Sequence, residues 1–513
     1  MVDEIADVTV VGGGDSGLLT ALCIRQLNPD VAIRIVDDVA ASRPDVGKST
    51  FQPIVDILHE FLQIDEAKFV EEVKPIWKAS VYFRHWRDRP PFHFPFDTYK
   101  LFRTPPNDRL AEQQYYHYDT VHPDPDYRTV NGEMVEQGVS PFFFAENGDL
   151  DRYPAFAYHL DTDRFNAFLR ELCSDREITL VDDRIERVQT SEGRIETARG
   201  CKDEYISDLY VDASGFNRVL KSELPGSFVD FELPLDAACN TRLPRDLSDV
   251  EPATVIETGE HGWFWQIDTF DYRDVGYVYA SEFVGREKAE RSFRDRFDLG
   301  DGDHSIGHYT FTSGYYEDAW AGNCIAIGNA GGFIEPLQST GLTANAQAAS
   351  ILSILLAAHD RCNHPGIRRT FNARVQAIWQ TVYDFVCAHY RYACGGTPFW
   401  DRMSEVTGSD HLEAIVKEYD ANGINTDVTA LRHDAVVFEL AHYYYIMRNM
   451  GATSAYYEGN SIEVGEDIQE RIDAVFEGIP DRVQEYLTPE EFYRGLSASE
   501  RARAIRRLGR RSR

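Results

Sequence analysis

The chain of 513 residues is poor in lysine and carries no paired-cysteine motif. Only 9 of its 52 basic residues are lysine, and acidic residues are in such excess that the formal net charge is -33. A nucleic-acid-binding protein needs a basic face to contact phosphates, so this charge argues against a nucleic-acid partner. The eight cysteines are scattered, without a Cys-x-x-Cys pair or the spacing of metal ligands, which argues against a metal site and favours a reduced protein.

Long apolar runs and targeting signals are also missing. No uninterrupted apolar stretch approaches the roughly 18 residues that a membrane helix needs, and the acidic N-terminus leads into a strand rather than a signal sequence. We therefore expect a soluble, cytoplasmic protein with no membrane partner. An acidic, lysine-poor composition is typical of salt-accumulating halophiles, because salt near 1 M screens charges beyond about 3 Å. An acidic mesophilic enzyme is the alternative.

The chain does contain a glycine-rich turn near its N-terminus. Residues 6–11 read as an apolar strand leading into the turn, residues 16–27 as a helix, and residues 31–37 as a strand that ends in an acid. This order is typical of dinucleotide binding, because glycines admit a tight turn, the helix N-terminus faces the pyrophosphate and the acid accepts from ribose hydroxyls. The expected cofactor-binding residues here are Gly12, Gly14, Ser16, Gly17 and Asp37.

A second glycine-rich segment, residues 328–341, follows more than three hundred residues later. A buried strand over 323–329 leads into it, and residues 342–358 have helical apolar spacing, so Thr340 and Gly341 are expected at a helix N-terminus. Free backbone N–H groups at such a position suit an anion. Two distant glycine-rich turns on one chain indicate a flavoprotein, in which both segments close over one long cofactor.

From about residue 365 the pattern is helical, with an apolar face that includes Phe371, Val375 and Phe385. The segment 501–513 is basic and is expected to be a solvated tail, with contact to a neighbouring acidic subunit as the alternative. His159 has no ligand-like spacing and is expected to be a structural or a surface residue.

Several short motifs along the chain together match one known family. They are Gly12 to Gly17, Gly47 to Thr50, Asp212 to Phe216, Trp263 to Ile267, Glu335 to Gly341, Asp384 to Tyr390, and Phe399 with Trp400. By these motifs, most of the chain resembles the flavin-dependent halogenases of the tryptophan-halogenase group. The glycine motifs are shared with many flavin monooxygenases, whereas the tryptophan pair and the Asp-Phe-x-x-x-His-Tyr segment are more specific.

The resemblance implies FAD and a halide as cofactors. Reduced flavin (FADH2) from a separate flavin reductase, oxygen and chloride or bromide would give hypohalous acid, and a lysine would direct the halogen to an electron-rich, indole- or phenol-like substrate. The further implied residues are Ser49, Val188, Asn329 and Leu342 at FAD, Thr340 and Gly341 at the halide, Trp263 and Trp265 shielding the flavin, and Phe94 and Phe96 stacking on the substrate.

Lys78 is the candidate catalytic lysine. It stands in a strand-like apolar segment, residues 75–83, where burial would lower the pKa of its ammonium and make the amine usable as a hydrogen-bond donor or a nucleophile. A surface lysine with a buried stem is the alternative. Anchoring the match on Phe83 and Trp86 instead places Tyr82 at the family's lysine position, and strand alternation predicts that Lys78 and Tyr82 share one face.

Three residues depart from the family's pattern. Gln338 is a candidate catalytic residue, but it stands where tryptophan-specific members have glutamate, and an amide polarises a lysine or accepts a proton less well than an acid. Asp268 follows Ile267 where the family has proline. Lys48 stands where the family has an acid, and the sequence offers no physical account of that change.

The expected fold is α/β, with a Rossmann-type FAD-binding core of the flavin monooxygenase kind, a substrate-covering sheet and a helical C-terminal lobe. The FAD-binding module is expected over 1–364, with the sheet drawn from about 70–160 and 220–315, and the lobe over 365–513. No second nucleotide fingerprint for NAD(P)H is present, so we expect a two-component halogenase served by a reductase, with a homodimer as one assembly. The alternatives are an FAD-dependent monooxygenase or reductase of the same fold and a catalytically silent flavin-binding protein.

Overall fold

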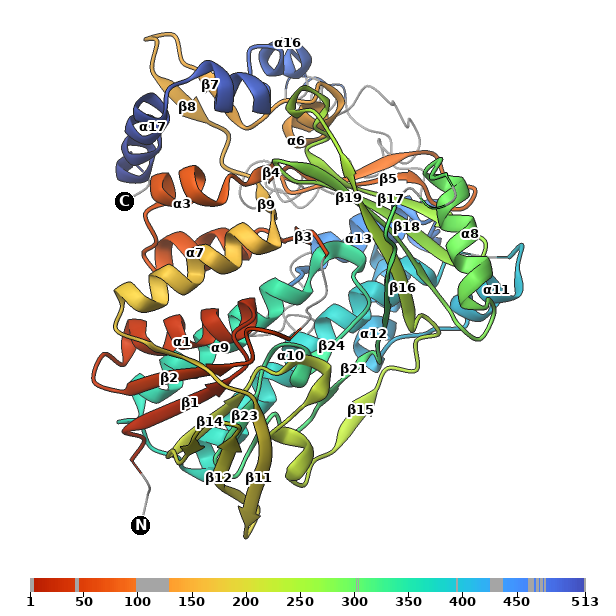
Figure 1. Cartoon of the computed structure of the whole chain (residues 1–513). Helices are drawn as coiled ribbons and strands as arrows, with labels where there is room; N and C mark the ends of the chain where they lie inside the picture. Colours follow the sequence, from red (N-terminus) through yellow and green to blue (C-terminus); the bar gives the residue numbers. More distant parts are fainter. Residues whose placement is uncertain are drawn as a thin grey trace. The chain divides into compact units, whose positions relative to one another are not determined.

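The chain divides into two compact units, each assembled from three segments (Figure 1). Unit 1 comprises Met1–Lys74, Leu160–Asp236 and Tyr309–Gln380, and unit 2 comprises Pro75–His159, Ala237–His308 and Thr381–Arg513. The domain division expected near residue 364 stays a prediction. The computed structural model describes residues 4–41, 46–97, 129–300, 302, 304–393, 395–424, 437–459, 466, 470, 474 and 477–511.

Unit 1 is built on a six-stranded sheet with the order β10-β2-β1-β14-β23-β22, in which all pairs except β22–β23 are parallel. Its strands are β1 (Asp7–Val11), β2 (Ala32–Asp37), β10 (Thr179–Asp182), β14 (Leu209–Asp212), β22 (Trp320–Ala321) and β23 (Cys324–Ala326). The strands expected over 6–11 and 31–37 are confirmed within one residue. In an open parallel sheet, ligands bind outside the carboxyl ends of the strands, where the glycine-rich turns lie.

Helices of unit 1 cover this sheet, and α1 packs on both α7 and α9 (Figure 1). The helical segments are α1 (Asp15–Leu27), α2 (Pro53–Asp56), η1 (Ile57–Phe61), α3 (Glu66–Val73), α7 (Thr162–Asp175), η2 (Gly215–Asn217), η3 (Lys221–Glu223), η5 (Gly328–Ala330), η6 (Leu337–Ser339) and α9 (Gly341–Ala358). The smaller strands are β3 (Lys48–Ser49), β11 (Ile185–Ser191), β12 (Arg194–Gly200), β13 (Glu204–Tyr205), β15 (Phe228–Asp230), β21 (Gly314–Tyr316) and β24 (Gly332–Phe333).

Unit 2 is built on a seven-stranded sheet with the order β20-β16-β19-β18-β17-β5-β6. Its strands are β5 (Ser80–His85), β6 (Phe92–Pro95), β16 (Ala237–Pro244), β17 (Ala253–Gly259), β18 (Gly262–Asp268), β19 (Tyr272–Tyr279) and β20 (Gly307–Thr310). One face is closed by α8 (Arg286–Arg296), whose Ala289 and Phe293 pack with Phe264 and Tyr277. Because side chains alternate along a strand, the neighbours of Phe264 in β18, Trp263 and Trp265, lie on the opposite face.

Further strands and helices complete unit 2. The strands are β4 (Ile76–Lys78), β7 (Phe142–Phe144), β8 (Leu150–Arg152) and β9 (Ala157–Leu160), and the 3-10 helix is η4 (Leu247–Asp249). The remaining helices are α6 (Val130–Glu136), α11 (Pro398–Ser404), α12 (Asp410–Asn422), α13 (Leu440–Asn449), α14 (Ala455–Gly459), α16 (Ile479–Val483), η8 (Glu491–Gly495) and α17 (Ala498–Arg511). The long helix α10 (Pro365–Tyr390) belongs to unit 1 up to Gln380 and to unit 2 from Thr381. The start of α10 at residue 365 is as predicted, and Phe371, Val375 and Phe385 on its apolar face are buried.

The segment Leu337–Ala358, which includes α9, is long and apolar enough to cross a membrane by length and composition. One such helix is weak evidence for a membrane span, because the core helices of soluble proteins pass the same test, and 56% of the apolar window of this one is buried. It packs on α1 as part of the core of unit 1.

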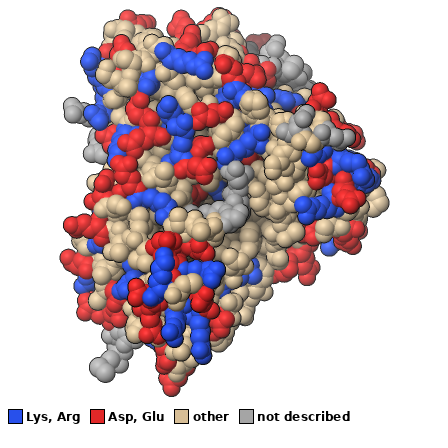
Figure 2. Space-filling model, in the orientation of Figure 1, with Lys and Arg blue, Asp and Glu red and all other residues tan. Residues whose placement is uncertain are grey.

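The prediction of a solvated basic tail from residue 501 is wrong for its first residues. They form α17, whose Ile505 and Leu508 are buried. The buried guanidinium of Arg501 donates to the carbonyl oxygens of Tyr493, at 2.7 Å, and Leu496, at 2.5 Å. Arginine carries an apolar stem and a multiply donating head, so it can anchor a helix as well as solubilise it. On the face shown in Figure 2, acidic and basic side chains are interspersed.

Candidate active site

The first glycine-rich turn of unit 1 leaves no room for side chains at two positions. A Cβ atom at Gly12, where φ is +109°, would lie 2.4 Å from the Ala213 carbonyl oxygen, and one at Gly17 would lie 2.0 Å from the Gly12 carbonyl oxygen. Both distances are far below any real contact of a Cβ atom, so the strand-to-helix turn requires glycine at both positions.

Gly14 has a different reason to be glycine. It is the N-cap of α1 in an extended conformation, no side chain caps the helix there, and no described protein atom lies within 4 Å of where its Cβ would be. An open space beside uncapped backbone N–H groups is what the phosphates of a dinucleotide occupy. The residues of this turn therefore fit the pyrophosphate of FAD.

Replacing Gly14 by threonine is expected to weaken FAD binding at least tenfold, about 1.4 kcal/mol, without destabilising the protein. Threonine and glycine are about equally good N-caps, and the protein itself leaves the site open, so only a bound cofactor would meet the new side chain. Fluorescence titration with FAD, beside thermal denaturation of the apoprotein, measures both. Unchanged FAD affinity would show that the cofactor does not fill this space.

Asp37 lies at the end of β2, as expected, but its carboxylate already has partners within the protein. One oxygen accepts from the Gly13 N–H at 2.8 Å, and the other pairs with Arg170 of α7, which also donates to the Gly13 carbonyl at 3.0 Å. Asp37 and Arg170 therefore hold the shape of the glycine turn. Arg170 could not be predicted from the sequence, because a lone arginine on an amphipathic helix gives no signal.

The unexplained Lys48 has a partner in the first turn of α1. Its ammonium lies 3.9 Å from the carboxylate of Asp15, which is nearly buried and accepts from the Asn166 side-chain amide at 3.2 Å. An acid in the pyrophosphate turn repels phosphate, and a nearby cation offsets that repulsion. The charges of Lys48 and Asp15 at the cofactor turn thus compensate each other.

The second glycine-rich turn meets the first. Gly328, at the start of η5 with φ of +69°, lies so close to Ser16 that a Cβ would approach the Ser16 Cβ to 2.9 Å. Asn329 is the next residue of η5. Segments more than three hundred residues apart in the sequence therefore lie side by side at the carboxyl ends of the sheet strands.

The predicted halide turn has an unusual backbone. Gln338 and Ser339 both have positive φ, +66° and +59°, although neither is glycine. Such conformations cost of order 1 kcal/mol or more each and cluster at functional sites. α9 then begins at Gly341, with Thr340 as its N-cap, which confirms the expected helix N-terminus.

The atoms of this turn suit an anion. The Thr340 hydroxyl is buried and has no hydrogen-bond partner among the described residues, and no described atom lies within 4 Å of where a Cβ at Gly341 would be. A free hydroxyl donor and helical N–H groups beside open space are what a halide binds.

The other predicted FAD contacts are spread over unit 1. Ser49 is in β3 and half-buried, and Leu342 is the second residue of α9. Val188 is in β11 and packs against a cluster that includes Val11 and Val36 of the main sheet. Their contact with FAD stays a prediction.

In unit 2, Lys78 is the last residue of β4 and is fully buried. Its ammonium lies 5.3 Å from the centre of the Phe96 ring. Burial holds the pKa of Lys78 well below its usual value, because the charged ammonium loses its hydration. The alternative of a surface lysine is wrong.

Lys78 and Tyr82 do not share one strand. The backbone leaves β4 at Ala79, whose N–H donates to the Pro252 carbonyl at 2.8 Å and whose carbonyl accepts from the Phe96 N–H at 3.1 Å. The alternation rule therefore does not extend from Lys78 to Tyr82. Tyr82 stacks on His93, with ring centres 4.3 Å apart, and packs against a cluster supplied by α6 and α16.

Trp263 and Trp265 lie on one face of β18, with ring centres 6.3 Å apart. A Cβ at Gly276 of β19 would lie 2.0 Å from the Trp265 ring, so the indole covers that glycine, and its N–H donates to Asp274 at 2.8 Å. Both tryptophans are held rigidly against the sheet. Their role beside a flavin stays a prediction.

Phe94 and Phe96 have different surroundings. Phe94 is fully buried against aromatic rings of α10 and α13, with centres 5.6 Å from Phe385 and 6.0 Å from Tyr445. Phe96 is the ring beside Lys78. Phe96 is therefore better placed than Phe94 to contact a substrate at the lysine.

The Asp-Phe-x-x-x-His-Tyr segment is structural in unit 2. Asp384 accepts from the Ser409 N–H and hydroxyl at 2.8 and 2.7 Å, which fixes the N-terminus of α12. His389 and Tyr390 pack on Trp86, the residue after the end of β5, within an aromatic cluster. In this chain the contacts described for Asp384, His389 and Tyr390 are those of helix capping and packing.

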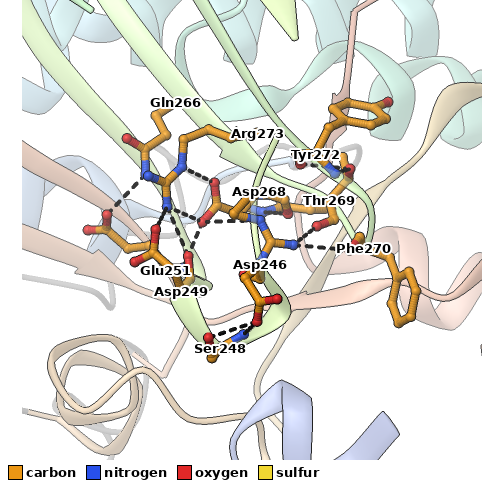
Figure 3. Close-up of polar contacts among 12 residues, drawn as sticks. Asp246, Ser248, Asp249, Glu251, Gln266, Asp268, Thr269, Phe270, Tyr272 and Arg273 are labelled. Carbon is orange, nitrogen blue, oxygen red and sulfur yellow. Dashed lines mark hydrogen bonds and ion pairs between the residues drawn. The ribbon is translucent and has the colours of Figure 1, made fainter. Parts of the chain in front are cut away.

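Asp268 is fully buried at the centre of a charged network (Figure 3). It accepts from the Arg273 guanidinium at 2.7 and 2.9 Å and from the Glu251 N–H at 2.8 Å, and Arg245 lies 4.0 Å away. The network joins β18 and β19 to the loop before β17. It accounts for an aspartate where the resemblance led us to expect proline.

The family model for tryptophan halogenases matches residues 7–461. The chain belongs to the tryptophan halogenase family. Two relatives are the 7-chloro-L-tryptophan 6-halogenase KtzR of Kutzneria sp., 28% identical over 75% of this chain and 79% of the relative, and the tryptophan 7-halogenase RebH of Lentzea aerocolonigenes, 26% identical over 82% and 83%. The chain is thus a flavin-dependent halogenase and an oxidoreductase.

Solved structures agree with this fold. The halogenase superposes on MibH, a lathipeptide tryptophan 5-halogenase, with a TM-score of 0.82 at 25% identity, covering 98% of this chain and 94% of that one. It superposes on the tryptophan 6-halogenase SttH of Streptomyces toxytricini with a TM-score of 0.80 at 24% identity, covering 96% and 100%. The predicted α/β fold with a Rossmann-type core is confirmed.

Proposed function

We propose that this halogenase is a two-component enzyme that uses FADH2 from a separate reductase, oxygen and chloride or bromide to halogenate an electron-rich aromatic substrate through hypohalous acid. The observation that carries the proposal is the full burial of Lys78, which depresses its pKa. Burial disfavours the charged ammonium, because it removes the water that solvates the charge. A neutral amine at this position can donate a hydrogen bond to hypohalous acid or react with it.

Different residues of unit 1 would bind FAD and the halide. The open space at Gly14 and the uncapped N-terminus of α1 would hold the FAD pyrophosphate, and Asn329 would contact the cofactor from the second turn. Thr340 and Gly341 would hold the halide. When bound, reduced FAD supplies the oxidising chemistry by reaction with oxygen.

The residues of unit 2 act on the substrate side. Lys78 would hold the oxidised halogen and direct it to one ring carbon, and Phe96 would orient a flat aromatic ring by offset stacking. Trp263 and Trp265 would keep organic molecules away from the flavin. Gln338, which belongs to unit 1, would orient rather than ionise, because an amide neither carries charge nor takes up a proton at neutral pH.

The named relatives halogenate tryptophan, so the substrate class we propose is an indole or a comparable phenol. The neutral Gln338 favours a substrate other than free tryptophan, since the glutamate expected in tryptophan-specific members is missing. We also propose a cytoplasmic enzyme adapted to high salt, on the strength of its net charge of -33.

The test is an assay of the purified protein in concentrated salt with FAD, a flavin reductase, NADH, oxygen and bromide. A panel of indoles and phenols is followed by mass spectrometry, and omission of the reductase serves as control. A brominated product that depends on reductase and bromide supports the proposal. A hydroxylated product would show a monooxygenase, and NADH oxidation without added reductase would show a single-component enzyme.

A further inference from the structure

His159 lies beside the candidate catalytic lysine. In the antiparallel pair of β4 and β9, His159 is directly opposite Ile76, and Lys78 is opposite Ala157. Opposite residues of an antiparallel pair point to the same face, and so do residues two apart in one strand. His159 and Lys78 are therefore diagonal neighbours on one face of this ladder.

Both ring nitrogens of His159 form hydrogen bonds. Nδ1 lies 3.0 Å from the Asp268 carbonyl oxygen, and Nε2 lies 2.9 Å from the Thr254 hydroxyl. A carbonyl only accepts, so Nδ1 carries the proton, and in the neutral ring Nε2 accepts from the hydroxyl. The ring is fully buried, and burial together with the charge of Lys78 holds its pKa well below the usual value. His159 is thus a neutral imidazole of fixed tautomer.

The two partners of His159 lie in the sheet that carries the tryptophans. Thr254 is in β17, and Asp268 ends β18, which carries Trp263 and Trp265. One side chain therefore ties the ladder that carries Lys78 to two strands of the seven-stranded sheet.

The hydrogen bonds of the Asp268 side chain also fix the position of its backbone carbonyl. Arg273 and the Glu251 N–H hold that carboxylate (Figure 3), and Arg245 donates to the neighbouring Thr269 carbonyl. Proline, which the resemblance led us to expect here, would offer a carbonyl but no carboxylate for Arg273. The network is thus a feature of this chain's own sequence.

We propose that His159 and Asp268 are positioning residues that fix Lys78 relative to the tryptophan-bearing strand. This inference rests on the proposed function. Reactive groups lose rate steeply when they move by about 1 Å, so loosening this link lowers the yield of halogenated product per flavin oxidised. Cofactor binding, which belongs to unit 1, does not depend on it.

The test compares His159→Phe, His159→Asn and Asp268→Asn with His308→Gln, a control in the same unit. Asparagine at 159 keeps a donor for the Asp268 carbonyl, phenylalanine keeps only the volume, and Asp268→Asn keeps the shape of the acid without its charge. Three quantities are measured: FAD affinity, brominated product per NADH oxidised, and the rate of Lys78 acylation by acetic anhydride, followed by peptide mass spectrometry.

For His159→Phe we expect product per NADH to fall at least about tenfold, FAD affinity to stay within about twofold, and Lys78 acylation to rise at least about threefold as the strand loosens. His159→Asn recovers part of both effects, Asp268→Asn gives an intermediate loss, and His308→Gln gives none. Unchanged product yield and acylation in His159→Phe, or an equal loss of FAD binding, would overturn the inference.

The acylation readout separates this inference from the proposed function. If the wild-type protein yields no halogenated product but Lys78 acylation rises in His159→Phe and recovers in His159→Asn, the positioning role stands and the halogenation proposal fails. If the wild-type protein halogenates and neither variant changes acylation or yield, the positioning role fails alone.

Discussion

Replacing Lys78 by methionine is expected to lower the yield of halogenated product at least about 100-fold while FAD binding stays intact. Methionine is close to lysine in length and apolar, and removing a buried polar amine that is costly to desolvate leaves the fold as stable or more stable. The loss therefore reports chemistry and not unfolding. Product is quantified by mass spectrometry under the reductase-coupled conditions, and FAD affinity by fluorescence.

Two matched variants make this result specific. Lys288→Met removes an exposed lysine of the same unit, which pairs with Glu260 at 3.7 Å, and should leave product unchanged. Tyr82→Phe tests the alternative alignment and should also leave product unchanged, because Tyr82 packs against the α6 cluster. Full activity in Lys78→Met with loss in Tyr82→Phe would transfer the catalytic role to Tyr82.

Acidification from pH 6.5 to 5.5 is expected to destabilise the protein by about 1 kcal/mol for each of two buried histidines. His159 and His389 are fully buried, and burial lowers the pKa of His389 to about 3 and that of His159 well below its usual value. The unfolded chain binds protons at these rings below about pH 6.5 and the folded protein does not. The contribution of these two histidines to stability is therefore fully present above pH 6.5. It is lost as the pH drops from 6.5 toward the pKa values that the rings have in the folded protein.

Urea unfolding at pH 7.5, 6.5 and 5.5 in constant salt measures this slope. His389→Asn keeps a donor for the Phe385 carbonyl, which the wild-type ring contacts at 2.6 Å. This variant should bind about one proton fewer on unfolding at low pH, so its free energy of unfolding should fall less steeply as the pH drops. Equal free energies of unfolding at pH 6.5 and 5.5 would show that these rings accept protons in the folded protein.

Local patterns in the sequence were sufficient to predict the glycine turns and their flanking elements. The strands around Gly12, the helix to Leu27 and the helices that begin at Gly341 and Pro365 follow from apolar periodicity and from turn residues, which are local properties of the chain. The resemblance to halogenases rested on the same local motifs. It led to the family that the family model confirms.

Other features needed the tertiary structure, because their partners are far apart in the sequence. Arg170 holds the glycine turn from α7, and Asp15 gives Lys48 its partner. The end of strand β4 before Ala79 separates Lys78 from Tyr82. It follows from hydrogen bonds of Ala79 to Pro252 and Phe96, which no local sequence pattern predicts.

The sequence by itself determined the fold class, the cofactor turn and the family, because each depends on residue types at short, fixed spacing. Only the tertiary structure decided that Lys78 is buried, that Asp268 serves a charged network, and that His159 of the strand paired with β4 contacts the Asp268 carbonyl. Burial and hydrogen bonding at these residues are set by strands brought together from distant parts of unit 2. The chemistry of the lysine therefore depends on packing that spacing along the chain does not encode.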